Sequence, residues 1–431
     1  MDLIYIGYIG LAVMVVLIII GVPVAFSIGI VAVVGLFIAG GVKITLAQTT
    51  LVAWQVGTDF VIICIPLFVF MGKMAANSGI AADIYDALQK WVGRISGGLA
   101  IAAVMACGAF GAVTGSSVAS VATMGSIIRP ELKKYGYSDR LASGTLTASG
   151  SLAILIPPSV GFAFYGILTD TSIALLFIAG ITPGIILVAL YCIGVYVRCR
   201  ITPEVGPTGP SYSWRERIHS LKGTWPILFI FLLVIGGIYI GLFTPTEASA
   251  VGATGVTLVA FFLGRLTWPK VRDALITTGH VSGFLYAIIL SGYVLARFIA
   301  ITGVSQNLVK YVVGLDLGVY GFIGVMLVIY LILGMLLDVF GIMILSIPFF
   351  FPVAVSLGID PVWFGVFTVM MCEIGLLTPP VGVNVFTMHN IAPDIPMKTI
   401  FLGIISFTCY DLIVVGLITL FPEIPLWLTR T

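Results

Sequence analysis

Two proline pairs interrupt stretches of sequence that are otherwise apolar enough to lie in a membrane. The chain reads LIPPSVGF from Leu155 to Phe162 and LLTPPVGVN from Leu376 to Asn384. A proline inside a helix removes a backbone N–H donor and clashes with the preceding turn, so each pair should leave carbonyl groups without helical partners. In hydrocarbon, such groups are tolerated only where protein, water or an ion satisfies them. We therefore expect a broken helix at each pair, with freed carbonyl oxygens of the kind that coordinate a sodium ion.

Hydroxyl and amide side chains near both breaks would add oxygen atoms to these carbonyls. We expect two or more sodium ions, with one site at each break on either side of a bound substrate. The alternative is a structural kink whose carbonyls are satisfied by neighbouring helices. Asn384 is a candidate substrate-binding residue. The expected sodium ligands at the breaks are Ser149, Ser151, Pro157, Thr378, Pro379 and Gly382.

A second group of candidates lies in two long segments that are rich in small residues. The stretch TGSS, Thr114 to Ser117, offers hydroxyl groups and a helix start, which suit a carboxylate or a sodium ion. Asp338 is an ionisable residue within an apolar run. The alternatives are close packing at TGSS and a helix cap at Asp338. The sodium candidates here are Thr114, Gly115, Ser116, Asp338 and Gly341, and the substrate candidates are Ser116, Ser117 and Asp338.

Three other charged residues each allow two interpretations. Arg297 could bind a substrate carboxylate bidentately or extend its charge to the membrane surface, and we keep it as a substrate candidate. Glu373 precedes the second break and is either a polar anchor or a carboxylate near a cation. Glu247 lies in TPTE, where Thr244 would cap a helix, so we expect a structural role. The three histidines and six cysteines show no metal-ligand spacing, and no catalytic residue is expected.

The composition places these residues in a polytopic membrane protein. Of 431 residues, 60% are hydrophobic and 9% are charged, and the mean hydropathy is +1.19. A soluble domain would carry about 25% charged residues. The N-terminal MDLIYIGYIG lacks the basic region of a signal peptide, so we expect no cleaved leader. Apolar stretches of about 20 residues predict an all-α fold with five membrane crossings in each half of the chain.

The two halves align at a single offset. The distances Pro23 to Pro245, Pro130 to Pro352, Pro157 to Pro379 and Pro158 to Pro380 are all 222 residues, which indicates an internal duplication. Five crossings are an odd number, so the second copy should be inverted. We predict a first repeat at 1–200 with a re-entrant hairpin at about 97–128 and a break at 157–158, a cytoplasmic linker at 201–224, and a second repeat at 225–431 with a hairpin at about 317–351 and a break at 379–380.

The charge distribution predicts the orientation. The segment RPELKKYGYSDR, 129–140, has four basic residues, whereas its counterpart FPVAVSLGIDPV, 351–362, has none. Basic residues favour the cytoplasmic side of a membrane, so these segments should lie on opposite faces. If the basic linker is cytoplasmic, both termini are periplasmic.

Five ordered motifs carry a resemblance to a known family. They are GAVTGSSVASVATMG (111–125), LIPPSVGF (155–162), GLFTPTEASAVGA (241–253), GMLLDVFGIMILSIPFFFPVA (334–354) and EIGLLTPPVGVNVF (373–386). Across essentially the whole chain, the sequence resembles the large membrane subunit of tripartite ATP-independent periplasmic (TRAP) transporters. The resemblance implies a sodium-driven elevator transporter in the bacterial inner membrane that imports small organic anions. It also implies two partners, a separate small four-helix membrane subunit and a periplasmic substrate-binding protein.

Two other classes of protein are considered. A self-sufficient sodium/dicarboxylate cotransporter would share the hairpin architecture but would need no binding protein. An intramembrane enzyme is disfavoured because the chain has no HExxH motif and no Ser/Lys arrangement on facing spans. The sequence does not distinguish between C4-dicarboxylates, sialic acid and other keto acids as the substrate. The lipid bilayer is expected to surround the protein, and no nucleic-acid partner is expected.

Overall fold

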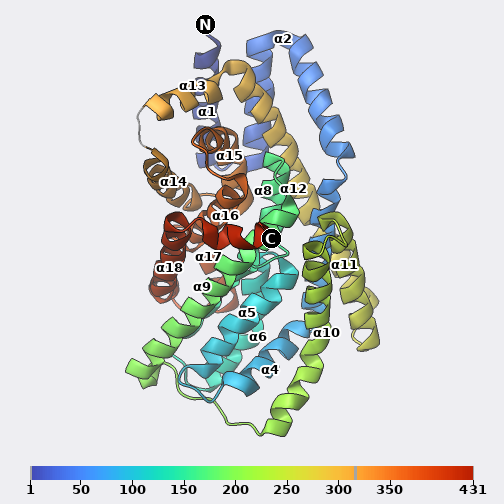
Figure 1. Ribbon diagram of the computed structural model, residues 1–431, viewed down its shortest axis with the longest axis vertical. Coiled ribbons are helices and arrows are strands. Elements are labelled where there is room, and N and C mark those ends of the chain that lie inside the picture. Colours follow the sequence, from blue (N-terminus) through green and yellow to red (C-terminus); the bar gives the residue numbers. More distant parts are fainter. Residues whose placement is uncertain (1, 315–317, 431) are drawn as a thin grey trace.

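The computed structural model describes residues 2–314 and 318–430, and within these residues it is all helical, without a strand. The helices form an elongated bundle with the N-terminus at one end and the C-terminus near the middle of its length (Figure 1). Among the described residues, six helices are long and apolar enough to cross a membrane, and two bent pairs raise this number to as many as eight. The expectation of an all-α polytopic membrane protein is therefore confirmed.

The first half of the chain contains nine helices before the polar linker. Its α3 and α4 are bent by 64° at a short break, and α7 and α8 are bent by 42° at the first proline pair. The helices are α1 (Leu3–Ile19), α2 (Val24–Thr58), α3 (Cys64–Asn77), α4 (Ile80–Val92), α5 (Gly98–Thr114), α6 (Ser117–Lys134), α7 (Asp139–Leu155), α8 (Val160–Thr169) and α9 (Ile173–Ile201), with 3-10 turns at Val61–Ile63 and Pro203–Val205.

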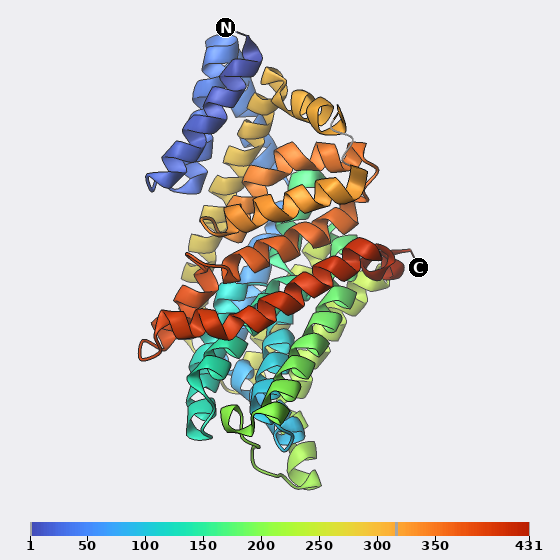
Figure 2. The same ribbon diagram turned by 90° about the vertical axis from the view of Figure 1, so that its left-hand side faces the viewer.

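The second half continues from the linker to the C-terminus. Figure 2 shows α14, α15, α16 and α18 as stacked rods that cross the molecule, in orange to red. The helices are α10 (Trp214–Tyr239), α11 (Pro245–Phe262), α12 (Trp268–Thr302), α13 (Val304–Gly314), α14 (Gly318–Gly334), α15 (Val339–Ser356), α16 (Pro361–Leu377), α17 (Val383–Ile391), α18 (Met397–Leu420) and α19 (Glu423–Leu426), with a 3-10 turn at Trp427–Thr429.

Helices in the two halves begin and end at positions that are 222 residues apart. This holds at both ends for α6 with α15 and for α7 with α16. The capping residues agree as well, since Ser138 caps α7 and Asp360 caps α16 through side-chain oxygens. Gly136 and Gly358, which end the preceding helices, both adopt a left-handed φ of 76° that favours glycine. The sequence offset therefore corresponds to matched local structure.

The structure differs from the sequence-based boundaries at several points. The first hairpin does not end near residue 128, because α6 continues through Pro130 to Lys134, and α15 likewise continues through Pro348 and Pro352 to Ser356. Membrane proteins accept helical prolines where neighbouring groups satisfy the freed carbonyls. The predicted linker at 201–224 is shorter, because α10 begins at Trp214. The predicted start of the second hairpin, residue 317, lies outside the described residues.

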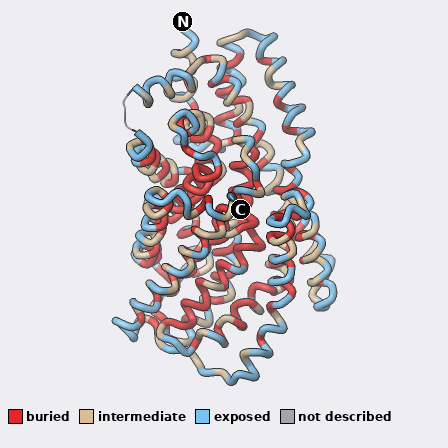
Figure 3. The backbone as a smooth tube through the Cα atoms, viewed as in Figure 1, coloured by how far each residue is buried: buried red, intermediate tan, exposed pale blue. Residues whose placement is uncertain are grey.

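The core is built around α5, α7 and α16, where almost every residue is buried. Figure 3 shows this buried centre, with exposed residues concentrated on the outer helices. Many exposed residues of α1, α2, α10 and α11 are large and apolar, including Phe37, Trp54, Phe229 and Phe262. A surface of this kind suits contact with lipid.

Ion pairs hold the C-terminal end of α6 against the loop between α17 and α18. The Arg129 guanidinium contacts the carboxylate of Asp394, and the Lys133 ammonium lies 3.0 Å from the same carboxylate. Hydrogen bonds from Lys133 and Arg129 lower the pKa of Asp394 below its usual value. Two of the four basic residues used to predict orientation therefore also join elements that are far apart in sequence.

Candidate functional site

The tip of the first hairpin rests directly on the first proline break. Gly115 adopts a left-handed φ of 58° between α5 and α6, and its carbonyl accepts a hydrogen bond from the Val160 N–H at 3.4 Å. A Cβ atom at Gly115 would lie only 2.9 Å from the carbonyl oxygen of Pro158. Glycine is therefore required here both by conformation and by space. Ser116 follows as the N-cap of α6, with its hydroxyl 3.5 Å from the Ala119 N–H.

The second hairpin also has a side-chain N-cap, but its tip does not contact a proline break in the same way. Asp338 is the N-cap of α15, and its carboxylate accepts a hydrogen bond from the Gly341 N–H at 3.2 Å. The hairpin packs closely on α16, because a Cβ atom at Gly334 would lie 2.2 Å from the Cα atom of Gly375. Within the described residues, no backbone hydrogen bond joins this tip to the second break. The capping role considered for Asp338 is present, and the sodium role stays a prediction.

The second break is more open than the first. Pro157 and Pro158 are buried, whereas Pro379 and Pro380 are exposed. The Thr378 hydroxyl donates to the Gly375 carbonyl at 2.9 Å and so completes the end of α16. A cavity of about 590 Å³ between this break and α18 is lined by Thr378, Pro379 and mostly apolar residues of α18. The two expected sodium sites are therefore unlike in their surroundings.

Eight of the fourteen buried side-chain N and O atoms that have no hydrogen-bond partner among the described residues lie in one group, on five helices that pack together. These helices are α6, α7, α16, α17 and α18, and each touches α7 or is α7 itself. Native proteins leave few such atoms unpaired, because each unpaired group costs about 1–3 kcal/mol. We call this set the polar interior; its side chains are Ser120, Thr145, Ser149, Glu373, Asn384 and Asp411.

Two acids of the polar interior, Glu373 and Asp411, lie on helices α16 and α18, which pack against each other. The Tyr191 hydroxyl of α9 donates to Asp411 Oδ1 at 2.7 Å, while Asp411 Oδ2 has no partner among the described residues. Glu373 lies within electrostatic reach of Asp411 and beside the Ser117 hydroxyl, but neither of its oxygens makes a hydrogen bond of normal geometry. Neither Tyr191 nor Asp411 was among the residues predicted from the sequence. A lone acid in an apolar span was the available signal for Asp411.

The remaining candidates are placed as follows. Thr114 and Ser151 are buried, and their hydroxyls donate to helix carbonyls of Phe110 and Ala148. Asn384 is fully buried in the first turn of α17, directly after the second break. Arg297 is exposed on α12 and makes no ion pair with any described acid. The candidates on α5, α6, α7 and α17 lie on helices that pack together, whereas Asp338 and Gly341 belong to α15, Thr378 ends α16 and Arg297 lies apart on α12.

Glu247 has the structural role expected for it. Its carboxylate accepts hydrogen bonds from both the backbone N–H and the hydroxyl of Thr244, each at 2.8 Å. The Thr244 hydroxyl in turn accepts from the Glu247 N–H at 3.3 Å. This is a complete capping box at the start of α11, with Pro245 at the first helical position.

The family is decided by comparison over nearly the whole length. The model of the tripartite ATP-independent periplasmic transporter, DctM component, matches residues 11–424. The chain belongs to this family. Its membership confirms the resemblance drawn from the five motifs, and it implies a small membrane subunit and a periplasmic binding protein as partners.

Curated relatives of this TRAP large permease agree. The C4-dicarboxylate TRAP transporter large permease protein DctM of Pseudomonas aeruginosa is 34% identical over 375 residues, which cover 86% of this chain and 87% of the relative. The sialic acid TRAP transporter large permease protein SiaM of Vibrio cholerae is 31% identical over 418 residues, which cover 95% of each. The ectoine TRAP transporter large permease protein TeaC of Halomonas elongata is 32% identical, covering 85% of this chain and 86% of TeaC. These relatives are transporter permeases rather than enzymes.

A solved structure shares the fold at low sequence identity. The Alcanivorax borkumensis YdaH transporter superposes with a TM-score of 0.64, covers 90% of this chain and 89% of its own, and is 12% identical. At this identity the likeness concerns the fold alone. The TRAP permease is therefore a multi-pass helical membrane protein.

Proposed function

We propose that this TRAP large permease carries a small organic carboxylate across the bacterial inner membrane together with two or more sodium ions. The observation that carries the proposal is the polar interior, where unpaired oxygen and amide atoms lie between the first hairpin and α16, α17 and α18. The unpaired oxygens would coordinate sodium ions, and Asn384 Nδ2 would donate a hydrogen bond to a substrate carboxylate. The substrate would therefore satisfy groups that are costly to bury alone.

The matched halves support an elevator mechanism with two inverted repeats. Helix ends and capping residues repeat at an offset of 222, and each half contains a hairpin and a broken helix. Inverted repeats with broken helices are typical of secondary transporters that bind substrate near the membrane midplane. In this scheme the hairpins and broken helices move together, and both termini face the periplasm.

The substrate class is proposed from the relatives and from the polar interior. The relatives are named for C4-dicarboxylates, sialic acid and ectoine, all of them small polar solutes. A small carboxylate is favoured because Ser116, Ser117 and Asn384 offer donors close to helix starts, where anions are stabilised. The small subunit is proposed to be a separate chain.

Uptake into proteoliposomes tests the proposal. The permease is reconstituted with its small subunit and the loaded binding protein, and an inward sodium gradient should drive uptake without ATP. Replacing sodium by potassium on both sides should abolish uptake. Uptake that persists in potassium contradicts sodium coupling, and full uptake without the binding protein identifies the alternative, a self-sufficient cotransporter.

A further inference from the structure

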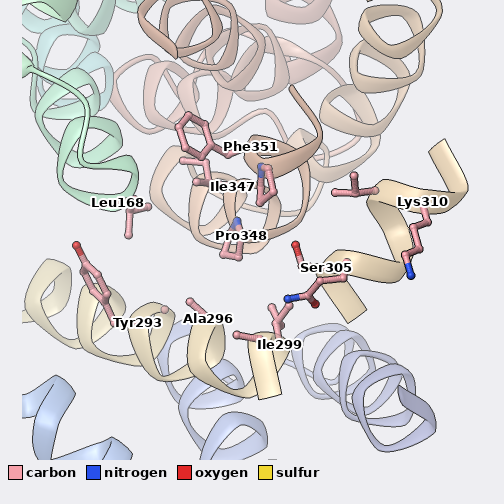
Figure 4. A pocket seen from close by; sticks show the side chains of 14 residues that line it. Leu168, Tyr293, Ala296, Ile299, Ser305, Lys310, Ile347, Pro348 and Phe351 are labelled. Atoms are coloured by element: carbon pink, nitrogen blue, oxygen red, sulfur yellow. The ribbon is translucent and has the colours of Figure 1, made fainter. Parts of the chain in front are cut away.

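An apolar cavity opens between α12 and the second hairpin, away from the polar interior. Its volume is about 630 Å³, within the range of small-molecule sites. None of the candidate sodium or substrate residues lines it. The walls, shown in Figure 4, come from α8, α12, α13 and α15.

Small residues on one face of α12 create the cavity. Gly292, Ala296 and Ala300 are spaced four apart, so they lie along one side of the helix. At Gly292 the contact with α15 is tight, because an added Cβ atom would lie 1.9 Å from Ile344 Cδ1. One turn later, Ala296 leaves space opposite Pro348 of α15 (Figure 4), and Ala300 lines the cavity one turn further along. The cavity is therefore open in its middle and closed at one end.

The polar groups of the lining are Tyr293 of α12 and Ser305, Gln306 and Lys310 of α13. The Tyr293 hydroxyl already donates to the Ile167 carbonyl at 2.6 Å. The other polar groups come from α13, where Lys310 is exposed and has no acidic partner among the described residues. Figure 4 places Lys310 and Leu168 at opposite ends of the cavity. The cavity thus has an apolar body and one cationic end.

The surroundings of Lys310 resemble the surface region of a bilayer. The adjacent Tyr311 is 65% exposed. Exposed tyrosines concentrate at the level of lipid headgroups, where lysine side chains also extend their charge. A small carboxylate would occupy only the α13 end, where Ser305, Gln306 and Lys310 offer donors, and would leave the apolar body unfilled. An acyl chain would bury its methylene groups there, and its phosphate would meet Lys310.

We propose that this cavity binds one acyl chain of an anionic phospholipid, with the phosphate at Lys310. The occupant links α13 and α12 to α15 of the second hairpin. The proposal does not depend on sodium coupling, because it concerns lipid that is bound when no transport takes place.

The headgroup is tested by native mass spectrometry of the purified chain with phosphatidylglycerol or phosphatidylcholine of identical acyl chains. Wild type should bind phosphatidylglycerol about fivefold more tightly, the factor expected where one basic residue faces a net negative headgroup, because the cationic choline of phosphatidylcholine offsets the charge of its phosphate. Lys310→Gln should remove this preference, and Lys310→Arg should keep it. Equal binding of the two lipids by wild type, or an unchanged preference in Lys310→Gln, overturns the proposal that Lys310 selects a net negative headgroup.

The acyl-chain site is tested by filling the cavity. Ala296→Trp should abolish binding of the tightly held lipid, and Ala250→Trp on the exposed face of α11 is the matched control that should retain it. Thermal unfolding checks that both variants fold. If Ala296→Trp does not fold, Ala300→Leu is the milder substitution that replaces it. Lipid retained at wild-type occupancy by a folded cavity variant, or binding of detergent alone in wild type, overturns the proposal.

Discussion

Ser116 and Asp338 cap the second helices of the two hairpins from positions 222 residues apart. Each side chain accepts a hydrogen bond from a backbone N–H three residues later, that of Ala119 or Gly341. Serine and aspartate are both strong N-cap residues, so either side chain could perform the structural task at either position. At this cap position, only the second hairpin has an ionisable side chain. A substitution that keeps the cap and removes the carboxylate can therefore distinguish a capping role from an ion-binding role.

The first prediction uses this relationship. Asp338→Ser keeps an N-cap oxygen and removes the charge, so the hairpin should still form. If Asp338 helps to hold sodium, the sodium concentration for half-maximal uptake should rise tenfold or more, which corresponds to about 1.4 kcal/mol. Uptake is measured in proteoliposomes over a sodium series. Asp338→Ala is the control that removes both cap and charge, and normal sodium dependence in Asp338→Ser would show that the residue is only a cap.

The breaks and hairpins were predictable because local chemistry determines them. The proline pairs at 157–158 and 379–380 remove backbone donors, and the structure interrupts a helix at both. The hairpin ends were harder, because Pro130 looks like a helix end in sequence yet lies inside α6. Whether a proline ends a membrane helix depends on which neighbouring groups satisfy the freed carbonyl, and the sequence does not contain that information.

The polar interior was only partly predictable for a related reason. Ser149 and Asn384 were found because they lie beside the breaks. The hydrogen bond between Tyr191 and Asp411 joins residues 220 positions apart, and it exists because α9 and α18 pack against each other. A sequence offset can indicate that two segments are equivalent, but it does not indicate which side chains meet between them.

The second prediction concerns orientation. Lys134 and Ser356 end α6 and α15 at equivalent positions, and both are exposed. In a background where the exposed Cys409 is replaced by serine, Lys134→Cys should react only with reagent that reaches the cytoplasm. Ser356→Cys should react with impermeant reagent applied from the periplasm. Labelling of both from the same side contradicts the inverted arrangement, and the parent without an added cysteine measures background reaction.

The third prediction concerns the ion pairs at Asp394. Because Lys133 and Arg129 lower the pKa of Asp394 in the folded protein, their stabilising effect is complete above the usual aspartate pKa of about 3.9. It is lost as the pH falls through the lowered pKa. Asp394→Asn should therefore lower the unfolding temperature at neutral pH, and its difference from wild type should shrink in acid.

Thermal unfolding of both proteins over a pH series measures this effect. Glu131→Gln is the control, because Glu131 is paired with Lys134 one turn along the same helix and does not join distant elements. Its effect on the unfolding temperature should be smaller than that of Asp394→Asn. A difference for Asp394→Asn that stays constant from neutral to strongly acidic pH contradicts the prediction.

The last prediction concerns the buried bond from Tyr191 to Asp411. Removing the hydroxyl with Tyr191→Phe leaves Asp411 Oδ1 without its donor, and an unpaired buried group costs about 1–3 kcal/mol. The free energy of unfolding should fall by that amount. Tyr410→Phe is the matched control, because its ring packs on Tyr191 and its hydroxyl makes no hydrogen bond to a described residue. In a double-mutant cycle, Tyr191→Phe should cost much less in an Asp411→Leu background, since the acceptor is gone. Additive effects of the two substitutions would show that the hydroxyl and the carboxylate act independently, and that Tyr191 contributes through ring packing alone.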